Sequence, residues 1–171
     1  GKNYTTSLNS NLAFLIKNDY TEFDLINYED TNMVFENKPI ILYLKEIDLF
    51  IVNFLASDNQ EKRMNEIKEI NNVYFDIKDK YKVDSNRILT CGNFKEQYGS
   101  VKKILGDLYS VSNNLGTVID EKFGNSNLDY DHIISITNLE SSPDESILKI
   151  DRDYKKIKEE ISPHLPLILR I

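Results

Sequence analysis

Two neighbouring segments, 39–45 and 48–55, limit the folds open to this chain more than any other feature. Both are rich in Ile, Leu, Val, Tyr and Phe, and they are joined closely around Glu46, which is typical of a β-hairpin. Within them, residues 40–42 and 51–52 are apolar on both faces of a strand. Such strands need cover on both sides, so we expect them to lie in a buried sheet.

A long amphipathic helix is predicted directly after this hairpin. The segment Asp58-Asn59-Gln60-Glu61 has the form of a capping box, with a side-chain acceptor at the N-cap and Glu61 at N3. Apolar residues then recur at alternating spacings of three and four, which predicts a helix over 59–82. The recurring positions are Met64, Ile67, Ile70, Tyr74, Ile77 and Tyr81.

A short strand and a second helix are predicted to follow. Residues 87–91 form a brief apolar run that is typical of a buried strand. Asn93 and Glu96 then have the spacing of another cap, and the apolar positions behind them predict a helix over 94–112. Gly106 falls inside this helix, at a cost of about 1 kcal/mol relative to alanine.

The N-terminal part of the chain predicts one helix and one strand. Leu8, Leu12, Leu15 and Ile16 share a face at helical spacing, so we expect a helix over 7–18. Residues 22–28 alternate between apolar and polar side chains, as a strand does.

The C-terminal part predicts two strands, a helix and a closing segment. The strands are expected over 115–120 and 132–137. Ser142 as N-cap and Pro143 at the first helical position begin a helix that ends at 162–163. The apolar tail, 165–171, is expected to pack as a closing strand or a short helix.

These elements predict one α/β domain over 1–171, because no repeat and no low-complexity linker interrupts them. After the first helix the order is β-β-β-α-β-α-β. That order predicts a mixed sheet with helices on both faces, of the RNase H-like or actin-like kind. The core of PD-(D/E)XK nucleases also begins with β-β-β-α-β, so the order alone leaves both architectures open.

Charge and cysteine content restrict the chemistry. The chain has 21 Lys and Arg against 28 Asp and Glu, a net charge of −7, which opposes binding to nucleic-acid phosphates. The single cysteine, Cys91, excludes an intramolecular disulfide. Together with His132 and His164 it is too little for the usual zinc site, so we predict no metal and no cofactor.

Location is predicted from the apolar runs. The longest, 40–44, is too short to cross a bilayer, so the chain is not expected to be transmembrane itself. No signal peptide is visible, and we expect a cytoplasmic protein that could meet a membrane through a partner. The sequence begins at Gly1 rather than Met, so a removed N-terminal segment stays open.

Nuclease chemistry would need carboxylates that gather around metal ions. The candidates are Asp24, Glu46 and Asp48, on the first predicted strand and the hairpin. The acid-x-Lys triplets of a PD-(D/E)XK site occur only on predicted helices, as in Asp76-Ile77-Lys78, where they would be solvated. The competing interpretation is that all of these are surface carboxylates of an acidic protein.

The segment Cys91-Gly92-Asn93 ends a predicted strand and opens a predicted helix. With its surroundings, 86–94 and the apolar positions up to Leu108, it resembles the strand–glycine–helix unit of actin-like ATPases, in particular PilM- and GspL-type proteins of pilus and secretion platforms. The ending 161–170, a short apolar segment that finishes with an arginine, is similar to the ending of those proteins. The resemblance implies nucleotide contact at Cys91, Gly92 and Asn93, where Asn93 stands in place of the family's second glycine. Cys91 alone is expected to be a buried thiol rather than a nucleophile.

Three functions remain open from the sequence. The favoured one is a non-catalytic assembly or scaffold module that binds a protein partner, such as a membrane-assembly component, in the manner of a reduced actin-like platform. The alternatives are a divergent PD-(D/E)XK or RNase H-like nuclease, and an acidic immunity or inhibitor protein that covers a basic toxin.

Overall fold

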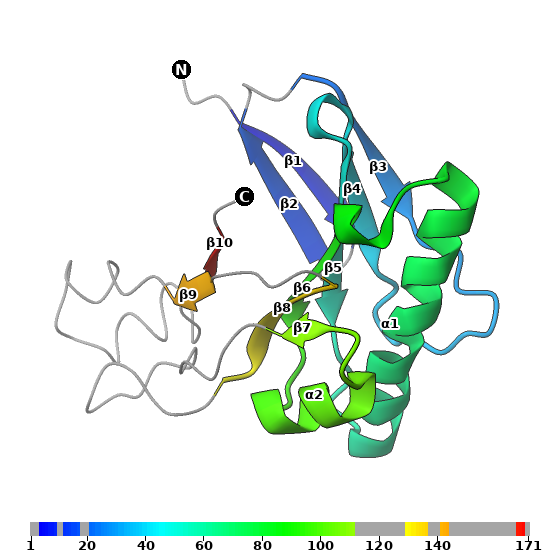
Figure 1. Cartoon of the computed structure of the whole chain (residues 1–171), viewed down its shortest axis with the longest axis vertical. Helices are drawn as coiled ribbons and strands as arrows, with labels where there is room; N and C mark the ends of the chain where they lie inside the picture. Colours follow the sequence, from blue (N-terminus) through cyan, green and yellow to red (C-terminus); the bar gives the residue numbers. More distant parts are fainter. Residues whose placement is uncertain are drawn as a thin grey trace, which may run out of the picture.

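The computed structural model describes residues 4–9, 12–17, 21–111, 129–136, 141–143 and 167–169 (Figure 1). Its centre is a mixed sheet of six strands in the spatial order β3-β4-β5-β6-β8-β7. The strands are β3 (Phe23–Asn27), β4 (Ile40–Leu44), β5 (Leu49–Leu55), β6 (Ile88–Asn93), β7 (Ser110–Val111) and β8 (Asp131–Ser135). β5 and β6 are parallel, and the other neighbouring pairs are antiparallel. The predicted mixed α/β class is therefore confirmed.

Two helices, α1 (Gln60–Tyr81) and α2 (Tyr98–Leu105), cover one face of this sheet. Side chains of β5 on that face, Phe50, Val52 and Phe54, form one core cluster with apolar residues of both helices. α1 carries the chain from the end of β5 to the start of the parallel strand β6. The predicted helix over 59–82 is confirmed, although its N-cap is Asn59, which accepts the Lys62 N–H at 3.0 Å, and not Asp58.

A hairpin of β1 (Tyr4–Asn9) and β2 (Leu12–Lys17) covers the opposite face, so Figure 1 shows hairpin, sheet and α1 as successive layers. Ile16 packs there against Leu42, Leu44, Leu49 and Leu89. The predicted helix over 7–18 is wrong. Leu12 and Ile16 are both buried at even spacing, and the hairpin uses this period of two in place of the helical one.

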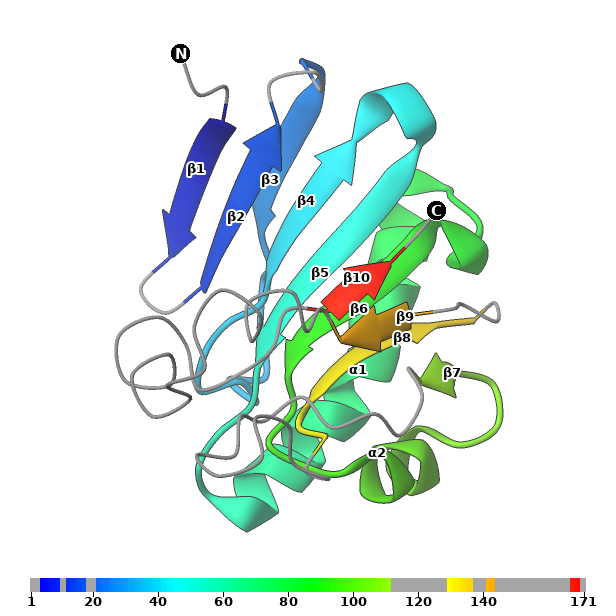
Figure 2. The ribbon, with the colours of Figure 1, turned by 90° about the vertical axis from the view of Figure 1, so that its left-hand side faces the viewer.

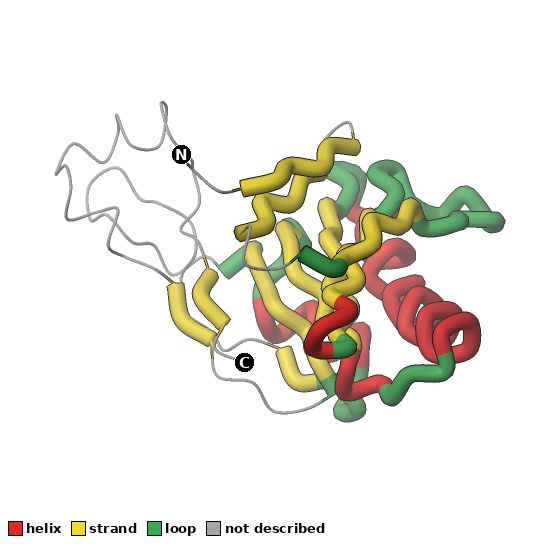
Figure 3. Tube along the Cα trace, turned by 90° about the horizontal axis from the view of Figure 1, so that it is seen from above, coloured by secondary structure: helices red, strands yellow, loops and turns green. Residues whose placement is uncertain are grey.

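This hairpin is the cover that the apolar strands require on their second face. Figure 2 shows it in front of the sheet, and Figure 3 shows the sheet strands and the long helix from above. Both described helices pack on the same face, whereas helices on both faces were predicted.

The end of α2 differs from its prediction. The helix stops at Leu105 rather than at 112, because its C-cap Gly106 leaves the helical conformation with a positive φ of +79°, which glycine adopts readily. β7 follows at once and supplies the last strand of the β-β-β-α-β-α-β order that runs from β3. The predicted strand over 115–120 lies outside the described residues.

The C-terminal part contributes β9 (Ser141–Pro143) and β10 (Leu167–Leu169), which pair antiparallel. Ser142 therefore lies in a strand and does not cap a helix, while the predicted closing strand of the tail is confirmed. The remainder of the predicted helix, 144–161, lies outside the described residues. In the part of the chain that the structure describes, no helix combines the length and the apolarity needed to span a bilayer.

Candidate functional site

The carboxyl ends of the parallel strands β5 and β6 meet at one edge of the sheet, with Leu55 opposite Asn93. The chain leaves β5 through 56–59 into α1, and it leaves β6 through 94–97 toward α2. A hydrogen bond from the Ala56 N–H to the Asn93 carbonyl (2.9 Å) ties these two connections together. Ligands of α/β sheets bind outside the carboxyl ends of the strands. We call this edge, formed by residues 56–59 and 93–97, the polar edge, and it is the candidate site.

Gly92 allows the two strands to approach at this edge. Its φ is +150°, and a Cβ atom added there would lie 1.8 Å from the Phe54 carbonyl oxygen. No residue with a side chain fits that space, so the glycine fixes the position of the segment that follows β6.

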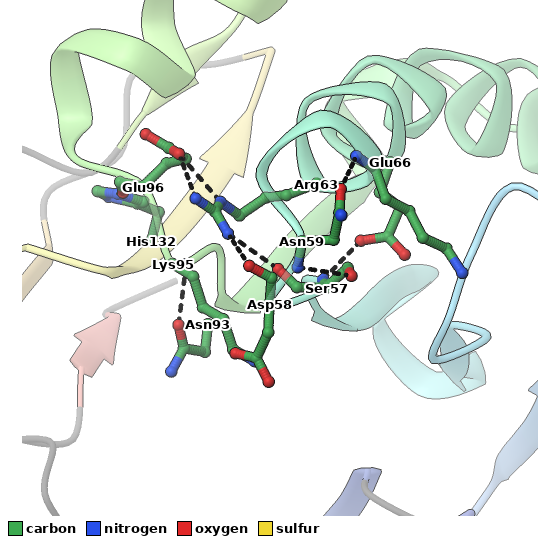
Figure 4. A network of polar contacts seen from close by, with 10 residues as sticks. Ser57, Asp58, Asn59, Arg63, Glu66, Asn93, Lys95, Glu96 and His132 are labelled. Atoms are coloured by element: carbon green, nitrogen blue, oxygen red, sulfur yellow. Dashed lines mark hydrogen bonds and ion pairs between the residues drawn. The ribbon is translucent and has the colours of Figure 1, made fainter.

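Lys95 and Asp58 present opposite charges at the polar edge. The Lys95 Nζ lies 2.7 Å from the Asp58 carboxylate, whose side chain is 93% exposed, whereas that of Lys95 is 27% exposed. The Lys95 hydrogen bond lowers the pKa of the Asp58 carboxyl, which is therefore ionised at neutral pH. The backbone N–H of Lys95 also donates to the Asn93 side-chain oxygen at 2.9 Å. Figure 4 shows Asn93, Lys95 and Asp58 extending to the same side.

Arg63 and Glu96 form a less exposed pair behind these residues. The Arg63 Nε and Nη2 atoms both lie 2.9 Å from one Glu96 oxygen. The Arg63 Nη1 group donates to the carbonyls of Ser57 and Asp58 at 3.1 and 3.0 Å. The guanidinium therefore joins the segment after β5 to the segment after β6 (Figure 4).

Glu66, in the second turn of α1, holds the same segment from inside the fold. Its side chain is fully buried, and its two oxygens accept the N–H groups of Glu36 and Ser57 at 2.6 and 2.7 Å. The Ser57 hydroxyl donates to the Glu36 carboxylate at 2.6 Å. These contacts fix the chain just before Asp58.

His132 supports the opposite side from β8. It is fully buried, its ring meets Phe94 edge-on at 5.5 Å, and its Nε2 lies 2.8 Å from the Glu96 carbonyl. Burial lowers the pKa of the imidazole, which is therefore neutral near pH 7. Because a carbonyl oxygen only accepts, Nε2 is the protonated nitrogen and donates to Glu96.

The predicted nuclease acids lie at the other end of β5, near the β4–β5 connection. Asp24 pairs with Lys45 at 2.8 Å. Glu46 accepts the N–H of Thr21 at 3.0 Å, and Asp48 accepts the Tyr43 hydroxyl at 3.0 Å. β5 spans seven residues, about 20 Å at the usual rise, so none of these acids reaches the polar edge.

The predicted nucleotide-contact residues do lie at the end of β6, but their described contacts are structural. Cys91 is partly exposed as a residue, while burial of its thiol raises the pKa to about 11, so it is protonated at neutral pH. Gly92 serves strand packing, and Asn93 caps the turn at Lys95. Sequence reasoning missed Lys95, Arg63 and Glu66 as site residues, and it treated Asp58 and Glu96 only as helix caps.

Within the described ranges, no group of three or more His, Cys, Asp or Glu side chains is placed to hold a metal ion. Asp58 and Glu96 at the polar edge pair instead with Lys95 and Arg63.

Comparisons with known proteins identify the fold. The sequence matches no family model and no curated protein sequence. Among solved structures, the chain is similar to TDP2 from C. elegans (TM-score 0.57, 10% identity, 96% of this chain and 57% of that one). It is also similar to an endonuclease/exonuclease/phosphatase family protein of Bacteroides thetaiotaomicron (0.55, 11%, 92% and 67%). A third similar structure is the mannosyl-6-phosphatase of that bacterium (0.53, 13%, 93% and 70%).

These neighbours correct two predictions. They are TDP2 and endonuclease/exonuclease/phosphatase proteins and not PilM- or GspL-type proteins, so the actin-like and pilus-platform assignment is wrong. The non-catalytic scaffold interpretation is overturned by the same similarities, which agree better with the nuclease alternative. The chain spans little more than half of the C. elegans TDP2 chain, 57%.

Proposed function

We propose that this chain hydrolyses phosphate esters at the polar edge of β5 and β6. The observation that carries the proposal is the Lys95 ammonium group, held 2.7 Å from the solvent-exposed Asp58 carboxylate where two parallel strands end. The fold similarity supports it, since the similar structures include a phosphatase and a member of the endonuclease/exonuclease/phosphatase family.

Each group at the edge has a role in such a reaction. The Lys95 ammonium neutralises the phosphoryl oxygens, whose negative charge grows as water attacks the phosphorus atom. The exposed Asp58 carboxylate accepts the proton of that water as the P–O bond forms. The bond from phosphorus to the ester oxygen then breaks, and the alcohol leaves with a proton taken from solvent. Asn93 positions the backbone of Lys95, and Arg63, which pairs with Glu96, positions the backbone of Asp58.

The proposed substrates are small phosphate esters rather than long nucleic acids. A net charge of −7 repels a polyanion over its whole length, whereas one phosphate group meets mainly the local field of Lys95. Such a substrate needs one ammonium group and no extended basic surface.

A substrate panel tests the proposal. The purified chain is incubated with p-nitrophenyl phosphate, bis(p-nitrophenyl) phosphate and a single-stranded oligonucleotide, each with Mg²⁺, with Mn²⁺ and with EDTA. We expect release of p-nitrophenol above the buffer rate, and faster turnover of the small esters than of the oligonucleotide. A folded protein that turns over none of the three under any condition contradicts the proposal, and preferential cutting of the oligonucleotide contradicts the substrate class.

A further inference from the structure

The segment 129–132, which ends with the first two residues of β8, holds the part of the polar edge that follows β6. The Tyr130 carbonyl accepts the backbone N–H of Phe94 at 2.7 Å. The buried Asp129 carboxylate accepts the backbone N–H of Tyr98, the first residue of α2, at 3.1 Å. Both ends of the connection between β6 and α2 are therefore positioned by this short segment.

His132 contacts the middle of the same connection with its side chain. The imidazole is fully buried, and its Nε2–H group donates to the Glu96 carbonyl at 2.8 Å. Figure 4 shows the ring beside Glu96, the residue that follows Lys95. The imidazole therefore fixes the backbone directly after the lysine to which we assign phosphate binding.

The other ring nitrogen of His132, Nδ1, is buried and has no hydrogen-bond partner among the described residues. In the neutral ring this nitrogen carries a lone pair and needs no acceptor. Protonation would place an N–H group of a charged ring at the same position, where no acceptor stands ready, and such a buried group is costly. The protonated ring must therefore shift toward an acceptor or water, and its Nε2 then leaves the Glu96 carbonyl.

Burial lowers the pKa of His132 below its ordinary value of 6.5, although several neighbouring groups oppose this effect. The Glu96 carbonyl, the carboxylates of Asp129 and Asp131 and the backbone of Asp129 all favour the imidazolium. The Glu96 carboxylate is itself paired with Arg63. The ring is therefore neutral near pH 7 and becomes charged only in more acidic solution.

We infer that His132 is a pH-sensitive positioning residue, whose protonation displaces residues 95–96 and inactivates the polar edge in acid solution. The displacement starts at the hydrogen bond to the Glu96 carbonyl and removes the neighbouring Lys95 from its place beside Asp58. The effect on turnover rests on the proposed phosphate-ester hydrolysis. The displacement itself does not, so the two can be tested separately.

The first test is a pH titration of the ¹⁵N-labelled chain by NMR, from mildly alkaline to mildly acidic solution. The ring nitrogens report the protonation of His132, and the backbone amides of residues 95–96 report the position of the connection. We expect a ring midpoint below 6.5 and the same midpoint at these two amides. The amides of residues 76–79, in the distant half of α1, are the internal control and should not follow it.

Two results of this titration would overturn the inference. One is a pair of amides at 95–96 that does not follow the His132 midpoint. The other is a ring that stays neutral until the whole chain unfolds. Neither result depends on turnover of a substrate.

The second test measures kcat/KM for p-nitrophenyl phosphate against pH. In the unaltered chain it should fall about tenfold per pH unit below the His132 midpoint, because only the neutral ring holds the site. His132→Gln keeps an N–H donor for the Glu96 carbonyl but cannot be protonated, so this acid limb should disappear. Asp107→Asn removes an exposed titratable group after α2 and should keep the original profile. The variants are compared at each pH, so that titration of the substrate cancels.

An acid limb that is unchanged in His132→Gln would contradict the inference. Absence of turnover in the unaltered chain would contradict the proposed function alone, because the amide titration still decides the role of His132. The same titration decides it if His132→Gln does not fold.

Discussion

Lys95 stands at the polar edge with its backbone in a left-handed conformation, at φ +51°. For a residue other than glycine, such a conformation costs roughly 1–3 kcal/mol, and residues with strained backbones cluster at functional sites. Here the hydrogen bond from the Lys95 N–H to the Asn93 side chain stabilises it. Met33, Asp48 and Lys82 have similar φ values of 53°, 50° and 57°, so the backbone conformation of Lys95 does not by itself mark a functional residue.

The Asp58 carboxyl should titrate below its ordinary pKa of 3.8, since the Lys95 ammonium group stabilises its charged form. NMR titration of the carboxyl carbon measures this directly. In Lys95→Gln the midpoint should rise toward 3.8, and in Lys82→Gln it should not change. An Asp58 midpoint that is the same in all three proteins would show that the Lys95–Asp58 pair does not form in solution.

Glu66→Gln should destabilise the fold by about 1–3 kcal/mol, because the amide NH₂ would face a backbone N–H that now has a carboxylate acceptor. Chemical denaturation gives the free energy of unfolding. Glu61→Gln, an exposed change in the first turn of the same helix, is the control and should stay within about 0.5 kcal/mol. Equal values for the two variants would refute the structural role of Glu66.

At the scale of elements, the contact of β5 with β6 at Gly92 sets the geometry of the site. Gly92→Ala should cost at least about 3 kcal/mol or prevent folding, because the new methyl group would overlap the Phe54 carbonyl. Gly99→Ala in α2 meets no atom within 4 Å and should stabilise by up to about 1 kcal/mol. Thermal unfolding distinguishes them, and a well-folded Gly92→Ala protein would disprove the close approach.

Elements with a strong local pattern could be predicted from the sequence. α1 carries six apolar positions at helical spacing, and β4 and β5 are apolar along their length. The predicted bounds of these three elements therefore agree with the observed bounds within one or two residues. The β1–β2 hairpin was missed because Leu8, Leu12, Leu15 and Ile16 satisfy the helical period as well. α2 was predicted too long because Gly106 was taken for an interior residue when it is a C-cap.

The candidate site was less predictable than the elements that carry it. Asp58, Asn93 and Glu96 stood out as capping residues, but nothing local marks Lys95, which comes 37 residues after Asp58. Arg63 and Glu96 likewise meet across 33 residues. Such pairs form only once the parallel strands are adjacent, and the spacing of residues along the chain does not reveal that adjacency.

For the whole molecule, the order of elements was a poor guide to architecture. The order β-β-β-α-β-α-β is present, yet it led to an actin-like interpretation, whereas the similar structures are TDP2 and endonuclease/exonuclease/phosphatase proteins. What distinguishes this fold is non-local: β8 pairs antiparallel with β6, and the β1–β2 hairpin covers the face opposite the helices. The pairing of β8 with β6 leaves no periodic signal in the chain, and the apolar spacing of the hairpin also satisfies a helical period.

The most direct test of the account compares phosphate-ester turnover in two lysine variants. Lys95→Gln and Lys82→Gln each remove one ammonium group that contacts an Asp carboxylate, at 2.7 and 2.8 Å, but only Lys95 lies at the polar edge. We predict that kcat/KM for p-nitrophenyl phosphate falls about 100-fold or more in Lys95→Gln, the usual effect of losing one charge-stabilising group, and is unchanged in Lys82→Gln. Equal activity in the two variants would contradict catalysis at the ends of β5 and β6.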